Sequence, residues 1–273
     1  MAEPRPPQIL DINRLPPEIR SAIVGFVVQT YEHQASLRHS SNRFGFSLAP
    51  FASVCREWQQ VVEKTTFSEL HLSLDRMGEF EQYVTRNRRR RLRIIRLQVK
   101  LPTYDSDPCT SRETWDDKMA NNQIFTLTFK RLFGTLSQWP DDIVAPGGIK
   151  LEMCTSSPSD LRNAPFDVWQ KRRWNANDIG EKRFADSVLD FVGNSEVERV
   201  VGIFEQVFAI TSFKTSVIDR RAIMPAAYAE IVAALPRARD VQLDIIKEKR
   251  LPLRKLAFTR MLYSCLFSPI PLS

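Results

Sequence analysis

The chain has 273 residues, of which 43% are hydrophobic, so it is long enough to bury a substantial core in one larger or two smaller domains. Its formal net charge is +7, and four scattered cysteines with three histidines offer neither a zinc cluster nor a disulfide framework. We therefore expect no metal and no cofactor. The first residues lack a secretory signal, and the apolar run at residues 22–28 is too short to span a bilayer. These features predict a cytoplasmic and/or nuclear protein with no membrane partner.

Residues 1–10 contain three prolines and few apolar side chains, which predicts a disordered tail. A first helix is predicted to begin at Pro16 and Pro17, because proline is tolerated in the first helical turn, where Glu18 also complements the helix dipole. The apolar residues that follow at helical spacing predict one stripe: Ile19, Ile23, Phe26 and Val27.

The next segment, at about residues 28–47, is mostly polar and is predicted to be an inserted loop. A second helix is predicted from Leu48 to about Thr66, because apolar residues recur there at spacings of three and four. Cys55 falls within that stripe, so we expect a packed side chain rather than a nucleophile.

These two segments resemble an F-box. Residues 15–19 read Leu-Pro-Pro-Glu-Ile and residues 54–58 read Val-Cys-Arg-Glu-Trp, which is similar to the start of the first helix and to a later helix of that family. The resemblance covers residues 11–66. The polar insertion departs from the family pattern because it is longer than the family usually has at this place.

The resemblance implies docking on a SKP-family adaptor and, through it, on a cullin. The protein would then be the non-catalytic substrate receptor of an SCF-type cullin–RING ubiquitin ligase, which presents a protein substrate for degradation. The residues implied in adaptor binding are Leu15, Pro16, Ile19, Ile23, Val54, Arg56 and Trp58. Burial in the protein's own core is an open alternative for Ile23 and Val54, whereas Leu15, Pro16 and Trp58 are expected on the partner surface. Arg56 either contacts an acidic adaptor surface or is solvated.

Residues 67–273 are predicted to form a mixed α/β substrate-recognition domain. Strand patterns are centred near residues 71, 97, 151, 213 and 242, and helical patterns cover about 77–84, 124–136, 225–235 and 253–267. One strand and one helix per unit is typical of leucine-rich-repeat solenoids, although the regular signature is missing, so we predict an irregular, degenerate array. Similar arrays follow the F-box in many predicted F-box proteins of filamentous fungi. The segment Pro158-Ser159-Asp160 also looks like that group. The chain stops without a polar cap, so a short or truncated array is expected.

Two polar stretches, residues 103–122 and 155–183, interrupt the array and are predicted to be surface insertions. An alternative for the second is substrate binding, since aromatic and arginine side chains dominate interface energetics. The residues that suggest it are Trp169, Arg172, Arg173 and Trp174.

Seven arginines fall between residues 86 and 96, among them Arg88, Arg89, Arg90 and Arg91. This basic patch could neutralise phosphates, direct nuclear import or meet an acidic partner, and the plain alternative is a solvated turn between a helix and a strand. No aromatic residue interleaves the run, so nucleic acid is not expected as a partner.

Catalytic motifs are missing from the sequence. It has no Gly-rich phosphate loop, His-Glu-x-x-His or Gly-x-Ser-x-Gly, and it contains only nine glycines, so we do not expect an enzyme. Two alternatives to the ligase function stay open. The protein could be an F-box scaffold that acts outside ubiquitin ligation, or a basic nucleic-acid-binding protein whose F-box match is accidental.

Overall fold

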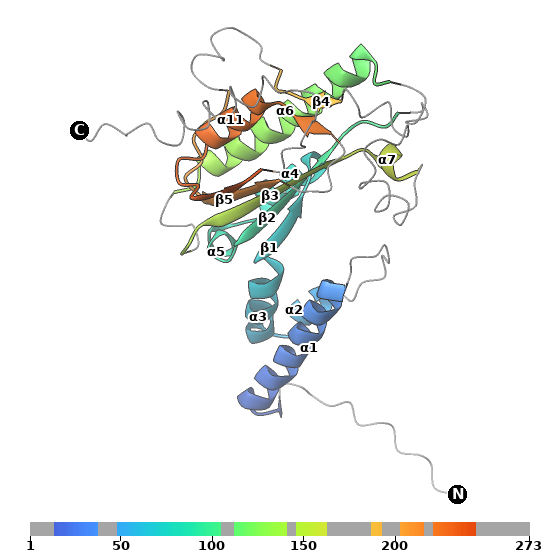
Figure 1. Cartoon of the computed structure of the whole chain (residues 1–273). Coiled ribbons are helices and arrows are strands. Elements are labelled where there is room, and N and C mark those ends of the chain that lie inside the picture. The colour runs from blue at the N-terminus through green and yellow to red at the C-terminus, as the bar shows by residue number, and fades with distance from the viewer. Residues whose placement is uncertain are drawn as a thin grey trace, which may run out of the picture. The chain divides into compact units, whose positions relative to one another are not determined.

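The computed structural model describes residues 14–37, 48–104, 112–140, 146–162, 187–192, 203–215 and 221–243 (Figure 1). The chain divides into two compact units, residues 1–68 and 69–273. Among the described residues, no helix combines the length and the apolar character that crossing a bilayer requires.

The first unit is helical, and α1 (Pro17–Leu37) is longer than the sequence predicted. The loop predicted for residues 28–47 is wrong over residues 28–37, which are helical. Polar composition misled here: the segment contains no Gly or Pro, and side chains such as Gln and Glu are good helix formers. Residues 38–47 lie outside the described residues.

The second predicted helix is two helices, α2 (Ala49–Ala52) and α3 (Arg56–Thr66). The Ser53 hydroxyl donates to the Pro50 carbonyl oxygen at 2.7 Å, which helps to end α2. Cys55 then adopts an extended backbone, with φ −161° and ψ 170°, directly before α3. The prediction of one continuous stripe that includes Cys55 is therefore wrong, although the thiol is half-buried.

A small core holds these helices together. It consists of Val24, Val28, Leu48, Trp58 and Val62. The Trp58 ring stacks on that of Phe51, with 6.1 Å between their centroids. Trp58 therefore joins α3 to both preceding helices.

The second unit is built on a five-stranded parallel sheet whose strand order follows the chain. Its strands are β1 (Glu69–Leu72), β2 (Ile94–Lys100), β3 (Ile149–Ser156), β5 (Ile210–Thr215) and β7 (Asp240–Gln242). All five lie where the alternating pattern predicted them. The mixed α/β class is thus confirmed in its coarse form, whereas the repeat solenoid stays a prediction.

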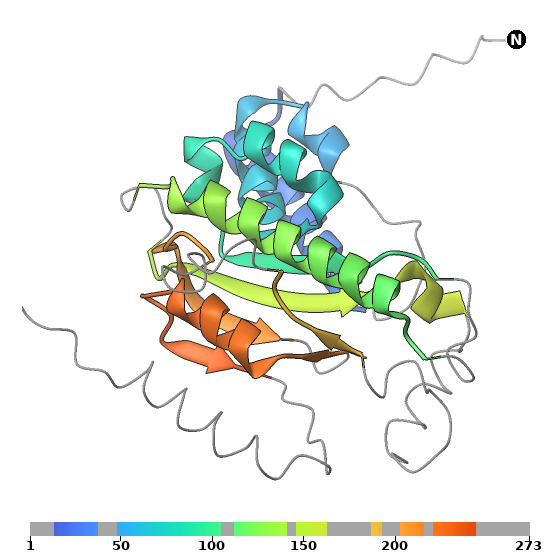
Figure 2. The ribbon, with the colours of Figure 1, turned by 90° about the horizontal axis from the view of Figure 1, so that it is seen from above.

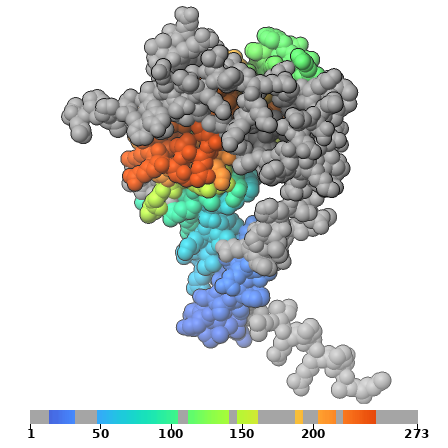
Figure 3. All heavy atoms as spheres, viewed as in Figure 1, coloured from blue at the N-terminus to red at the C-terminus, as the bar shows by residue number. Residues whose placement is uncertain are grey.

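The sheet has one apolar face, and it is covered by α4 (Met77–Tyr83), α6 (Trp115–Ser137) and α11 (Pro225–Ala233), as Figures 1 and 2 show. The strand register places apolar residues side by side on this face, in the row Leu70, Ile95, Leu151, Phe213 and Val241. In the space-filling view, the orange atoms from residues 203–243 lie directly against the yellow-green atoms of β3 (Figure 3).

Three short helical segments and a small second sheet complete the described part of this unit. The helical segments are η2 (Leu74–Arg76), α5 (Arg86–Arg89) and α7 (Pro158–Arg162). The small sheet pairs β4 (Val188–Leu189) with β6 (Ala222–Ile223) in parallel. The sequence did not reveal β4 or β6, because two residues are too few for an alternating pattern.

Helix α6 begins nine residues before the predicted start at Ile124. Thr114 and Asp117 form a reciprocal capping box, in which each side chain accepts a hydrogen bond from the other residue's backbone N–H at 3.1 Å. The surface insertion predicted for residues 103–122 is therefore wrong over residues 115–122. Asn121 within this segment is buried.

The turn before β3 requires glycine. Gly147 and Gly148 have positive φ angles of 92° and 75°, a region that other residues avoid. A Cβ atom on Gly148 would also lie only 2.2 Å from Cγ2 of Thr211. The start of β3 therefore passes the neighbouring strand β5 at a distance that no side chain permits.

Five phenylalanine rings interlock between α6 and the segments that follow β4, with neighbouring centroids 4.7–6.1 Å apart. They are Phe125, Phe129, Phe133, Phe191 and Phe204.

We expect Phe129→Ala to lower the free energy of unfolding by about 3–5 kcal/mol, because Phe129 is 0% exposed and its loss leaves a cavity. Denaturant unfolding measures this. Leu127→Ala on the same helix is the control, since Leu127 is 51% exposed and should change stability far less. Equal effects of the two substitutions would contradict this packing.

Candidate functional site

The residues implied in adaptor binding lie at three different depths of the helical unit. Pro16, Ile19, Val54 and Arg56 are exposed, whereas Leu15 and Ile23 are half-buried. Ile23 packs against the unit's core, so the core alternative fits that residue.

Trp58 is only 2% exposed, so the expectation that it faces a partner is wrong. An indole ring has a large apolar area, and in this unit the adjacent Val24, Val28 and Phe51 provide its cover. Its Nε1–H is buried with no hydrogen-bond acceptor among the described residues. Trp58 therefore holds α3 in place from within the core and does not itself form part of the unit's surface.

Helix α1 is apolar on two faces, which the sequence did not separate. Its buried face centres on Val24 and Val28, and the opposite face exposes Ile19, Ala22 and Phe26 at spacings of three and four. We call these three residues the outer apolar face. Phe26 is 72% exposed and Ile19 is 48% exposed. The predicted stripe is helical but is not buried as a whole, because Ile23 and Val27 pack at the edge of the core whereas Ile19 and Phe26 are exposed.

The basic patch in the sheet unit is more ordered than a solvated turn. Arg88 donates to the Tyr83 carbonyl oxygen at 2.8 Å, and Nε of Arg89 donates to that of Val84 at 3.0 Å. Both carbonyls lie at the end of α4, where arginine side chains commonly satisfy unpaired acceptors. Arg90 is exposed. Two arginines of the patch thus satisfy carbonyl oxygens at the end of α4.

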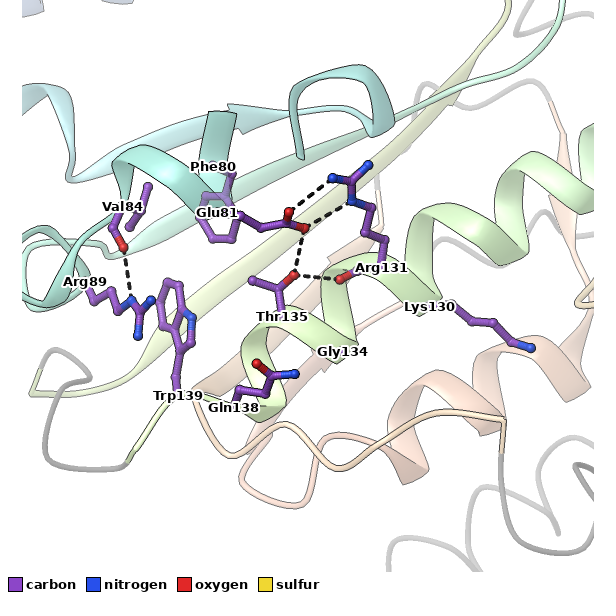
Figure 4. A pocket seen from close by; sticks show the side chains of 10 residues that line it. All are labelled: Phe80, Glu81, Val84, Arg89, Lys130, Arg131, Gly134, Thr135, Gln138 and Trp139. Atoms are coloured by element: carbon purple, nitrogen blue, oxygen red, sulfur yellow. Dashed lines mark hydrogen bonds and ion pairs between the residues drawn. The ribbon is translucent and has the colours of Figure 1, made fainter. Parts of the chain in front are cut away.

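Arg89 also lines an open groove of about 500 Å³ between α4, α5 and α6 (Figure 4). Its guanidinium carbon lies 4.7 Å from the centre of the Trp139 ring. Across the groove, the Glu81 carboxylate pairs with Nε and Nη2 of Arg131, each at 3.1 Å, and accepts a hydrogen bond from Thr135 at 3.2 Å. The hydrogen bond from Arg131 lowers the pKa of Glu81, and Glu81 in turn raises the pKa of Arg131.

The face of the sheet opposite the helices is polar. The register aligns His71, Arg96, Glu152, Lys214 and Gln242 across all five strands. Arg96 pairs with Glu152 at 2.7 Å and also with Glu69, which lies two residues before His71 in β1, at 2.5 Å. Burial acts to raise the pKa of Glu152, but a hydrogen bond from Lys150 and the charge of Arg96 lower it overall. The charges of this face largely compensate each other.

A buried polar cluster lies beyond the carboxyl ends of β2 and β3, where parallel sheets commonly place ligand sites. Arg221 donates to both oxygens of Asp160, at 2.9 and 3.3 Å, and its Nε lies 3.8 Å from Glu113. The Tyr104 hydroxyl and the Ser157 backbone N–H also donate to Asp160, at 2.8 and 2.7 Å. The Asp160 carboxylate is thus used by the protein itself. Ser157 and Asp160 are buried, so the predicted surface insertion is also wrong where it starts.

Trp169, Arg172, Arg173 and Trp174 lie outside the described residues. Their role in substrate binding stays a prediction. Within the described residues, no group of three or more His, Cys, Asp or Glu side chains could hold a metal ion.

Sequence reasoning missed Glu81, Trp139, Glu113 and Arg221. Each partner lies far away in the chain: 50 residues separate Glu81 from Arg131, and 61 separate Asp160 from Arg221. Asp160 stood in a segment with a family resemblance, but nothing there indicated a buried ion pair. No local pattern could have found these pairings.

Comparisons with protein families, with curated proteins and with solved structures gave no match for this chain.

The Asp160 cluster predicts an acid-sensitive stability. Burial acts to raise the pKa of Asp160, but hydrogen bonds and charge from Arg221 lower it below its usual value of 3.8. The stabilisation is therefore fully present above that pH and is lost as pH falls through the lower, folded-state pKa. Asp160→Asn should lower the free energy of unfolding by roughly 3–5 kcal/mol at neutral pH, because it removes the closest charge partner of a buried arginine.

Denaturant unfolding at several pH values measures both effects, and the variant should lose less stability on acidification than the wild type. Asp75→Asn is the control. It removes an exposed carboxylate paired with Lys100 at 2.9 Å and should cost no more than about 1 kcal/mol. A stability loss for Asp160→Asn no larger than that of the control would contradict the structural role of the cluster.

Proposed function

We propose that the protein is the substrate-recognition subunit of an SCF-type cullin–RING ubiquitin ligase. In this proposal the helical unit is an F-box that binds a SKP-family adaptor, and the sheet unit is a short, irregular leucine-rich-repeat-like solenoid that captures a protein substrate. The site of action would be the cytoplasm, the nucleus or both.

The outer apolar face of α1 is the observation that supports this proposal best. The helical unit already has a core, and still Ile19 and Phe26 remain largely exposed on α1, while Val54 and Val61 of the same unit are partly exposed. Burying a side chain of this size fully contributes roughly 1.5–3 kcal/mol. Two or three such anchors would offset part of the cost of association.

The motif residues divide their tasks in this proposal. Pro16, Ile19 and Val54 are accessible and would contact the adaptor directly, and exposed Arg56 would meet an acidic adaptor side chain. Trp58 would hold α3 in place from within the core. Leu15 is half-buried and would contribute its exposed part.

The sheet unit suits capture of a partner because its polar face presents side chains from five strands in register. Parallel strands in chain order, with the described helices α4, α6 and α11 on the same face, are compatible with a repeat array. Trp169, Arg172, Arg173 and Trp174 would add to the substrate surface.

We expect Phe26→Asp combined with Ile19→Asp to reduce co-purification of the adaptor at least tenfold, because charges replace the exposed anchors without entering the core. Adaptor recovered per mole of tagged chain measures this, and circular dichroism checks the fold. Tyr83→Asp is the control, since Tyr83 is also exposed but lies in the sheet unit. Undiminished adaptor capture by the double variant would sink the F-box proposal.

Reconstitution with adaptor, cullin and RING subunit then tests the ligase itself. Ubiquitin should be transferred to proteins that the chain enriches. Adaptor binding without transfer to any enriched protein would favour a scaffold instead.

A further inference from the structure

The geometry points to the groove between α4, α5 and α6 as a binding site for a small organic anion, held through its phosphate or carboxylate group by Arg89 (Figure 4). This inference does not depend on the proposed F-box function, because every residue that lines the groove belongs to the sheet unit.

Arg89 is fixed in place before any ligand arrives. Its Nε donates to the Val84 carbonyl oxygen at 3.0 Å, and the face of its guanidinium lies over the Trp139 ring at 4.7 Å. Trp139 is itself held by stacking on Phe80, with 5.6 Å between the centroids. These contacts orient the planar fork, so little side-chain entropy remains to be lost on binding.

The Nη atoms of Arg89 remain available. Neither has a hydrogen-bond or ion-pair partner within the described residues, although Arg89 is only half exposed. Two parallel N–H groups in this arrangement match the oxygens of a carboxylate or a phosphate. An arginine whose face and Nε are already occupied can thus still bind an anion through its edge.

The charge of the groove favours an anion. Among the described residues that line the groove, Glu81 is the only acidic one, and Arg131 neutralises its carboxylate through two hydrogen bonds. The charge of Arg89 is then not balanced by that carboxylate. Glu81 also anchors α4 to α6, so it is committed to the structure rather than to Arg89.

The size and lining of the groove favour a small, polar ligand. Its volume of about 500 Å³ lies within the usual range for small-molecule sites. Gln138 adds a hydrogen-bonding amide on the other side of the Trp139 ring from Arg89, as Figure 4 shows. Gly134 leaves the wall open, because a Cβ atom there would meet nothing within 4 Å.

Three related probes test the inference: glycerol phosphate, glycerate and uncharged glycerol. Each is titrated into the full chain at constant ionic strength, and the signal of the Trp139 indole N–H, assigned with Trp139→Phe, is followed by NMR. Glycerol phosphate and glycerate should shift this signal to saturation, and glycerol should not. A tighter site for glycerol phosphate identifies phosphate as the preferred group, whereas a tighter site for glycerate identifies carboxylate.

Two variants locate the site. Arg89→Gln should lower the affinity for the anion by about tenfold or more, because charged hydrogen bonds are lost. Arg90→Gln removes the same charge from a neighbouring residue that does not line the groove. It should lower the affinity for the anion no more than about twofold, because only a screened long-range attraction is lost. Gly134→Leu fills the groove and should abolish binding. Its fold should be kept, because leucine is the better helix former.

Thermal unfolding of each variant checks that the fold is intact. If Arg89→Gln unfolds, Arg89→Lys keeps the charge but lacks the planar fork and should still bind the anion more weakly than the wild type. Equal losses for Arg89→Gln and Arg90→Gln would show general attraction to the basic patch and overturn the inference. Binding that survives Gly134→Leu, or no saturable binding of either anion, would overturn it as well.

Discussion

Packing of α6 against the apolar face of the parallel sheet is the interaction on which the rest of the second unit depends. The helix places Phe125, Phe129 and Phe133 in an interior that is 0% exposed at each of these rings. Because helices cover one face of the sheet, the polar side chains of the strands gather on the other face, where Arg96 and its neighbours pair. The polar groups of the connections must then be satisfied at the strand ends, and the Asp160 cluster does this for the segments after β2 and β3.

In the helical unit, by contrast, apolar side chains remain exposed after the core has formed. Its core is completed by Trp58, and one face of α1 is thereby supported. The outer apolar face of the same helix lies beyond the reach of α2 and α3. A helix that is apolar on both sides needs a second cover, and this need is the physical basis for proposing a partner.

Much of the fold could be predicted from the sequence, because strand alternation is a local signal that survives in five separate segments. Helix limits were less predictable. The polar composition of residues 28–37 and 115–122 favours loops, yet these residues continue α1 and begin α6, since polarity alone does not break a helix. The site was predictable only where a local motif existed. The burial of Trp58 and the contact of Arg89 with Trp139 depend on how segments distant in the chain pack together. The local sequence around Trp58 or Arg89 does not indicate them.

The close passage of Gly148 beside Thr211 has a consequence for how this sequence can change over evolutionary time. Gly148 lies directly before β3 and Thr211 lies in β5, and the Thr211 hydroxyl also donates to the Gly147 carbonyl oxygen at 2.8 Å. Any side chain at position 148 would need the volume that the threonine fills, in a backbone conformation that already disfavours it. Positions 148 and 211 should therefore vary together or not at all among relatives of this chain, so their joint pattern would reveal whether a distant homologue keeps the same alignment of β3 and β5.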